Sequence, residues 1–298
     1  MVRFVLALWA CSRGVSAPAS APATAPVAPP PAAAPALPAA VGGLLTDACE
    51  PSALVRIGDT WIIGDNETED RVFAYDGAMR PVASRSLARA VEDVEALVVD
   101  GTNLIVVGSH SRNRGGKEKP NRKVVIDEAG GSFAVDLAGC PVCVAAEPLG
   151  PNEGGVNIEG AALVGDALAL GLRSPLDGGQ ALVLLVARGA EAGRIEQVLR
   201  IPLDGAGIRD MIPFRDGYLV IAGPAADAST PHTLWFLSRL DSPPQRLPVT
   251  LPTSTEGIWP LDARHLRYVV DGDGMPGACV TPGSWADIEI PDVQPSRK

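Results

Sequence analysis

Five stretches of this sequence share one layout, and this repeat constrains the fold more than any other feature. Each stretch begins at an acidic residue, continues as an apolar run, turns at a Gly or Asp, and ends after a second apolar run. The five are EPSALVRIGDTWIIGD (50–65), EALVVDGTNLIVVGSH (95–110), EGAALVGDALALGLR (159–173), DMIPFRDGYLVIAGP (210–224) and EGIWPLDARHLRYVVD (256–271). Short apolar runs joined by tight turns are typical of β-hairpins.

The spacing of the repeats predicts the fold class. The starting acids lie 45, 64, 51 and 46 residues apart, and strand-only repeats at about 50 residues are typical of propeller blades. The sequence therefore predicts an all-β protein, a β-propeller of five blades, with six blades as the alternative if one blade has lost its signature.

The charged ends of the hairpins should gather at one mouth of the central channel. The first strand of each blade lines that channel, and a hairpin returns the chain to the face it left. The starting acids are Glu50, Glu95, Glu159, Asp210 and Glu256, and we expect Asp65, His110, Arg173, Arg209 and Asp271 beside them.

The N-terminal part of the chain predicts export to the cell envelope. Residues 1–11, MVRFVLALWAC, have one basic residue, a short apolar stretch and then Cys11, the pattern of a signal peptide with a lipobox-like cysteine. Residues 12–43 are rich in Ala and Pro, a composition typical of an extended, disordered tether. The propeller domain should occupy 44–298. We therefore expect lipidation at Cys11 and a location on the periplasmic side of the bacterial envelope, as an outer-membrane lipoprotein, with secretion as the alternative.

Composition narrows the range of partners. The net charge of −10 argues against binding to nucleic acid. No apolar run approaches the length that spans a bilayer, so membrane contact should occur only through the N-terminal lipid. We expect a monomer.

The cysteines predict disulfides. Apart from Cys11 there are four, Cys49, Cys140, Cys143 and Cys279, an even number in a compartment expected to be oxidising. The CPVC pair, Cys140 and Cys143, should form a local disulfide, with a redox pair or half of a zinc site as alternatives. Cys49 and Cys279 would then join the start of the folded domain to its end.

Like charges gathered at one mouth need compensation. Two carboxylates ~4 Å apart repel by about 4 kcal/mol at an effective dielectric constant near 20. Arg173 and Arg209 would neutralise the ring, or a hard cation would. Calcium takes roughly six to eight oxygens and is the cofactor such a ring would bind; its expected ligands are Glu50, Glu95, Glu159, Asp210 and Glu256. Alternatively, each acid bonds backbone N–H groups and ties neighbouring blades together.

Several of these segments together resemble a bacterial family of unknown function. They are GSHSRNR (108–114), IEGAAL (158–163), GLRSPLDGGQALVL (171–184) and GIRDMIPFRDGYLVIAGP (207–224), which resemble the SHSR, IEG, GLRxP and GIRD signatures of that family over roughly 49–274. The family is similar in turn to the esterase-like phytase propellers, which share the DVEAL type of strand at 93–97. The resemblance implies a propeller with a phosphoesterase link, and it draws attention to Ser109, His110, Ser111, Arg112, Glu159, Arg173, Arg209 and Asp210.

Two main functions follow from these patterns. The first is an envelope-tethered propeller that binds an anionic small molecule, calcium or an envelope protein at its channel mouth. In that case the expected ligand-binding residues are Arg112, Arg173, Arg209, Ser109 and Ser111, because guanidinium groups bind carboxylates and phosphates bidentately. Arg112 also opens a loop, 112–123, with six Lys or Arg and one Glu.

The alternative is a calcium-dependent phosphoester hydrolase, with a glycan hydrolase ranked third. Its catalytic residues would be Glu95, Glu159, Asp210 and His110, with an acid as the general base and His110 as the proton donor. The feature that separates these functions is whether Glu95, Glu159 and Asp210 converge on one ion or are separately compensated.

Overall fold

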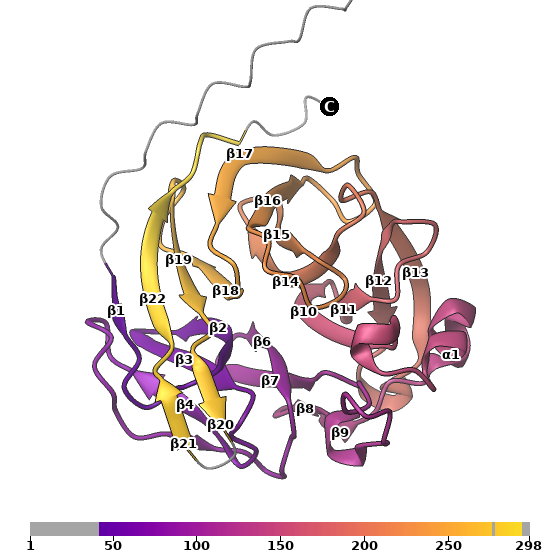
Figure 1. Ribbon diagram of the computed structural model, residues 1–298, viewed down its shortest axis with the longest axis horizontal. Coiled ribbons are helices and arrows are strands. Elements are labelled where there is room, and N and C mark those ends of the chain that lie inside the picture. The colour runs from indigo at the N-terminus through magenta and orange to yellow at the C-terminus, as the bar shows by residue number, and fades with distance from the viewer. Residues whose placement is uncertain (1–41, 276–277, 294–298) are drawn as a thin grey trace, which may run out of the picture. The chain divides into compact units, whose positions relative to one another are not determined.

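The computed structural model describes residues 42–275 and 278–293. Their strands form five four-stranded antiparallel sheets arranged as the blades of a ring (Figure 1). This confirms the predicted all-β propeller, with five blades and not six.

The first four blades follow one another along the chain, each running from an inner to an outer strand. Blade 1 comprises β2 (Pro51–Ile57), β3 (Thr60–Asp65), β4 (Arg71–Tyr75) and β5 (Arg85–Ser86). Blade 2 comprises β6 (Val94–Asp100), β7 (Asn103–Gly108), β8 (Val125–Asp127) and β9 (Gly131–Phe133). Blade 3 comprises β10 (Asn157–Val164), β11 (Ala167–Ser174), β12 (Ala181–Val186) and β13 (Ile195–Ile201). Blade 4 comprises β14 (Gly207–Phe214), β15 (Gly217–Gly223), β16 (His232–Leu237) and β17 (Gln245–Leu251).

Helices occur only in connections of the described residues. They are α1 (Pro141–Ala146) and the single turns η1 (Pro120–Arg122), η2 (Leu137–Gly139), η3 (Pro151–Glu153) and η4 (Gly189–Glu191). None of them is long and apolar enough to cross a membrane.

Blade 5 joins the two ends of the described chain. It comprises β18 (Thr255–Pro260), β19 (His265–Val270), β22 (Ser284–Glu289) and, as its outermost strand, β1 (Gly42–Leu44). β1 pairs with β22, Gly42 opposite Ala286 and Leu44 opposite Ser284, and the two lie side by side in Figure 1. A separate hairpin, β20 (Asp273–Met275) and β21 (Ala278–Thr281), precedes β22.

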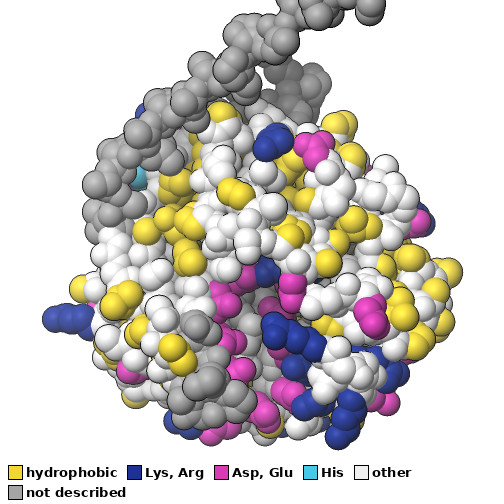
Figure 2. Space-filling model, in the orientation of Figure 1, with side chains coloured by type: hydrophobic (Ala, Val, Ile, Leu, Met, Phe, Trp, Pro, Cys, Tyr) yellow, Lys and Arg dark blue, Asp and Glu magenta, His cyan; other side chains and the backbone are white. Residues whose placement is uncertain are grey.

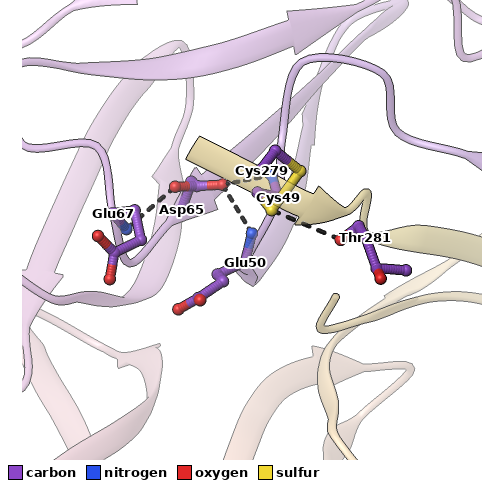
Figure 3. Close-up of a disulfide and its surroundings, with 6 residues drawn as sticks. All are labelled: Cys49, Glu50, Asp65, Glu67, Cys279 and Thr281. Atoms are coloured by element: carbon purple, nitrogen blue, oxygen red, sulfur yellow. Dashed lines mark hydrogen bonds between the residues drawn. A yellow bond between two sulfur atoms is a disulfide. The ribbon is translucent and has the colours of Figure 1, made fainter. Parts of the chain in front are cut away.

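A disulfide reinforces this closure. Cys49, which directly precedes blade 1, is bonded to Cys279 of β21 (Figure 3). Cys140 and Cys143, at the start of α1, form the second disulfide. Both predicted pairs are thus confirmed. The third predicted cysteine site, Cys11, lies outside the described residues, as do the predicted signal segment and nearly all of the tether.

Each boundary between neighbouring blades holds its own hydrophobic cluster. Leu54 and Trp61 of blade 1, for example, pack with Val269 of blade 5, and four further clusters fill the remaining boundaries. The inner strands converge so closely that only small residues fit between them. A Cβ at Gly257 would lie 2.8 Å from the backbone nitrogen of Leu54.

We expect removal of the Cys49–Cys279 disulfide to destabilise the whole ring. The bond spans 230 residues, and cross-linking a long loop restricts the unfolded chain most, so its loss should cost ~2–5 kcal/mol. The measurement is the free energy of unfolding in urea of the Cys49→Ala/Cys279→Ala variant. The matched control is Cys140→Ala/Cys143→Ala, which removes a cross-link across only 3 residues. A larger loss in the control would contradict this account of ring closure.

Candidate functional site

The first strand of every blade carries a β-bulge at the same position. The pairing of each inner strand with its neighbour skips one residue, which therefore has no partner in the ladder. A bulge redirects the side chain of the extra residue. The bulged residues are Ser52, Glu95, Glu159, Arg209 and Glu256.

This register differs from the one expected from the sequence at two blades. The alignment of starting acids put Glu50 and Asp210 at the repeated position, but the structure puts Ser52 and Arg209 there. A positive-φ turn residue follows the bulge by six residues in the first four blades, at Gly58, Gly101, Gly165 and Arg215. In these blades, counting back six residues from the turn, instead of searching for an acid, would have identified the bulged residue.

Arg209 is the only cation of this ring, and it lies among the carboxylates of neighbouring blades. Its Nη1 lies 2.9 Å from Glu159 Oε2, and its Nη2 pairs with Glu256. Its side chain is only 11% exposed. Gly223, at the end of β15, makes room for it, because a Cβ there would lie 2.9 Å from Arg209 Cγ. One guanidinium therefore links blades 3, 4 and 5.

A second arginine supports Glu159 from outside the ring. Arg173 Nη1 lies 3.2 Å from Glu159 Oε1, and its Nη2 lies 2.7 Å from Asp227 Oδ1. The side chain of Asn157 also donates to Glu159 Oε1, at 2.7 Å. Three donors, Arg173, Arg209 and Asn157, thus hold the carboxyl group of Glu159. The role of Asn157 was missed in the sequence, because an amide before a strand carries no distinctive signal.

Glu95 differs from the other ring acids because it has no such partner. No described residue forms a hydrogen bond or ion pair with its carboxylate, although the residue is only 8% exposed. Burial raises the pKa of Glu95 well above its usual value, and the nearby carboxylates of Glu159, Asp93 and Glu256 raise it further; only Arg209 lowers it.

Two more acids near the channel mouth also have raised pKa values. Burial raises the pKa of Glu159 to about 7, against the opposing effect of Arg209. Burial likewise raises the pKa of Asp271 to about 8, with added repulsion from Glu256 and Glu50. Negative charge is therefore only partly compensated in this region.

Four of the five ring residues form the floor of a cavity of about 820 Å³, namely Glu95, Glu159, Arg209 and Glu256. Ten acidic residues and four arginines line it. Figure 2 shows this hollow near the middle of one face, with acidic side chains gathered along it and Lys or Arg side chains on one side. Of the residues predicted as catalytic, Glu95 and Glu159 line the cavity, as do the predicted binding residues Arg173, Arg209 and Ser111.

Asp210 and His110 lie outside the cavity lining. Asp210 accepts hydrogen bonds from the backbone N–H groups of Met211 and Ile258, at 2.7 and 2.8 Å, and so ties blade 4 to blade 5. The His110 ring accepts from Val135 N–H through Nε2, and its Nδ1 donates to Gly108 O. Burial lowers the pKa of His110 to about 4, so the ring is neutral.

The predicted anion-binding side chains at and just before the start of the basic loop bond other protein groups. Arg112 donates to the carbonyl oxygens of Glu147 and Gly116 and is not in the cavity lining. Ser109 shares a 2.8 Å hydrogen bond with Ser111, which in turn donates to Asp93.

Asp65 has a structural role at the mouth. Its carboxylate accepts from the backbone N–H groups of Cys49 and Glu50 through Oδ2, at 2.8 and 3.0 Å, and from Glu67 through Oδ1 (Figure 3). These bonds shape the turn that carries Glu50 to the cavity. This arrangement corresponds to the alternative in which an acid bonds backbone N–H groups.

The carboxylates of the mouth are interleaved with arginines. In the described part of the chain, no three His, Cys, Asp or Glu side chains are gathered closely enough to hold a metal ion. The structure therefore provides no support for the predicted calcium site at Glu50, Glu95, Glu159, Asp210 and Glu256, which stays a prediction.

One family model matches this chain. Residues 148–246 match the family described as "Protein of unknown function (DUF3616)". The segment runs from the connection before blade 3 into the last strand of blade 4 and contains Glu159, Arg173 and Arg209. The predicted resemblance to a family of unknown function is thus confirmed, whereas the individual signatures and the similarity to phytases stay predictions. Among curated proteins, none matches this sequence.

Several solved structures are similar to this chain at low identity. A Thermus thermophilus protein provisionally described as an oxidoreductase (glucose dehydrogenase) has 13% identity and a TM-score of 0.42, covering 84% of this chain and 100% of its own. Virginiamycin B lyase from Staphylococcus aureus has 10% identity and a TM-score of 0.42, covering 83% and 99%. An exo-β-1,3-galactanase from Phanerochaete chrysosporium has 11% identity and a TM-score of 0.44, covering 80% and 60%. Identities this low do not transfer an activity to this chain.

We expect Arg209→Met to destabilise the protein by ~3–5 kcal/mol, because it leaves buried carboxylates uncompensated. The measurement is the free energy of unfolding in urea at pH 7. Arg246→Met is the control, since Arg246 is 56% exposed and lies 3.4 Å from Asp204; exposed pairs contribute ~1 kcal/mol or less. Equal losses in the two variants would contradict the central role of Arg209.

We also expect stability to fall as the pH rises from 5 to 8. The folded-state pKa values of Glu95, Glu159, Asp210 and Asp271 are all raised. Groups with raised pKa values stabilise the fold below their unfolded values, and this contribution is lost as the pH passes the folded values. The measurement is unfolding in urea across this range. Glu95→Gln should flatten the slope; an unchanged slope would argue against burial of an ionisable Glu95.

Proposed function

We propose that this protein is a ligand-binding β-propeller of the bacterial envelope that holds a small polar molecule in its cavity without converting it. The observation that supports this proposal is the cavity itself. Its volume of about 820 Å³ falls within the ~300–1,000 Å³ typical of small-molecule sites. Its floor consists of buried polar side chains from several blades.

The arrangement of the acids favours binding over hydrolysis. Glu159 is held by Arg173 and Arg209, whereas Asp210 bonds backbone N–H groups. A calcium-dependent phosphoester hydrolase needs several acids on one ion and a proton donor beside the substrate. His110, the predicted donor, bonds Gly108 and Val135 instead.

The envelope location belongs to this proposal. Two disulfides in the described residues support an oxidising compartment. The proposed anchor is a lipid on Cys11, joined to the propeller by the Ala/Pro-rich segment. Metabolic labelling with a radioactive fatty acid tests it, with Cys11→Ala as the control.

The experiment for function combines binding and turnover. We expect the melting temperature of the purified protein to rise with a small charged ligand, on the order of 5 °C at a hundredfold excess over Kd. Probes are calcium, EDTA, inorganic phosphate and the diamine putrescine. The same samples should show no release of nitrophenol from nitrophenyl phosphate or nitrophenyl glycosides.

Turnover of either substrate, abolished by Glu159→Gln, would contradict the proposal and establish a hydrolase. Glu191→Gln is the matched control for that variant, because Glu191 is exposed on η4 and pairs only with Arg194. A calcium-induced rise reversed by EDTA would support the predicted calcium site, and a phosphate-induced rise the predicted anionic ligand.

A further inference from the structure

Glu95 presents an unsatisfied carboxylate to the cavity. The residue is more than nine-tenths buried and lines the cavity floor, yet no described residue hydrogen-bonds or pairs with it. Buried carboxylates are normally paired, because an isolated buried charge costs several kcal/mol or more. The cavity beside Glu95 has room for a ligand to supply this partner.

The arginines that line the cavity are mostly committed to other acids. Arg122 pairs with Asp93 at 2.9 Å, in addition to the pairs of Arg173 and Arg209 described above. The fourth, Arg114, is exposed at the rim. An anionic ligand reaching the floor would therefore meet few free donors and an excess of acids.

A second acid with an unsatisfied oxygen lies at the side of the cavity formed by blades 5 and 1. Asp271 follows β19 and lines the cavity, and its Oδ1 is buried without a hydrogen-bond partner. The charged groups that act on it are Glu256, Glu50 and Asp65, all acidic. Those that act on Glu95 are Glu159, Asp93, Glu256 and a single cation, Arg209. The local field at both residues is negative and attracts a cation.

The spacing of the acids favours an organic cation over a metal ion. A calcium ion needs several oxygens converging at ~2.3–2.6 Å, and the described residues contain no such group. An ammonium or guanidinium group places several N–H donors in different directions and bonds each acceptor separately at ~2.7–2.9 Å. Dispersed carboxylates can therefore share one organic cation.

We propose that the cavity binds an organic cation, an amine or guanidine compound with two positive groups, one of which contacts Glu95 at the floor and the other Asp271 at the wall. This inference rests on the proposed function and specifies its ligand class. The raised pKa values of both acids support it: burial raises them most and repulsion from neighbouring acids raises them further, and a bound cation would offset both effects.

The test is isothermal titration calorimetry of the purified protein at pH 8 with putrescine, spermidine and agmatine. We expect at least one of them to bind. 1,4-Butanediol, which has the length of putrescine without its charges, should bind at least about tenfold more weakly, because it lacks the charge-assisted bonds. Calcium and inorganic phosphate complete the set of probes.

Variants locate the binding site. Glu95→Gln should weaken binding of the organic cation about tenfold or more. Its melting temperature should be equal to or higher than that of the unchanged protein, because the substitution removes a buried ionisable group. Glu69→Gln is the matched control, since Glu69 lines the same cavity but is exposed; its effect should stay below about threefold, as for exposed charges. Equal effects of the two variants would overturn the assignment to Glu95.

Proton release provides an independent readout. Because the cation needs ionised acids, affinity should rise from pH 6 to pH 8, and calorimetry in two buffers of different ionisation enthalpy should show protons released on binding. Putrescine itself stays protonated throughout this range. Affinity that is independent of pH would overturn the involvement of Glu95 and Asp271.

The outcomes separate the inference from the proposed function. Binding of phosphate, calcium or the neutral diol without any organic cation would overturn the inference but leave a ligand-binding propeller. Failure of every probe to bind would overturn the inference, and turnover of a nitrophenyl substrate would overturn the proposed function.

Discussion

Arg209 places one positive charge among buried carboxylates that come from other blades, and the polar end of the propeller depends on this placement. Its guanidinium contacts Glu159 and Glu256 directly. Pairs of this kind are worth little in water, but they become essential once the carboxylates are buried, because each acid would otherwise be left without compensation. The apolar side chains of the strands form five separate clusters, one between each pair of neighbouring blades. The side chain of Arg209 alone connects three blades through their charged ends.

The distribution of charge around the channel mouth is uneven. On the side of blades 3 and 4, Arg173 and Arg209 neutralise Glu159 and Asp227. On the side of blades 5 and 1, the carboxylate of Asp65 accepts hydrogen bonds from backbone N–H groups only. Asp271 Oδ1 is buried without a hydrogen-bond partner. A five-fold arrangement of strands therefore carries an asymmetric field. Arg209 and Ser52, which replace Glu at the bulged position, contribute to this asymmetry, as does Arg173 at the end of β11.

Much of the fold could be predicted from local patterns, and the site only in part. Hairpins with Gly or Asp turns repeat at about 50 residues, so the five blades could be predicted. Both disulfides could be predicted from the even number and the positions of the cysteines. The bulge could not be predicted, because the extra residue looks in sequence like any other strand residue. Only the register of the strand pairing reveals it. The alignment consequently chose Asp210 over its neighbour Arg209. The burial of His110 could not be predicted either. Its ring bonds Gly108 and also Val135, which lies 25 residues further along the chain, and no local sequence pattern predicts such a contact.

The position of β1 has a consequence for how the chain folds as it is made. Its three residues leave the ribosome before any blade, yet the strand they pair with among the described residues is β22, which begins at Ser284. Until β19 has been made, the growing chain is an open arc whose first blade exposes an apolar face, the surface around Leu54 and Trp61 that later covers Val269. Contacts between such distant segments form slowly and leave the chain open to aggregation. A chain that ends before β22 therefore leaves β1 without this partner and blade 5 without its two outer strands.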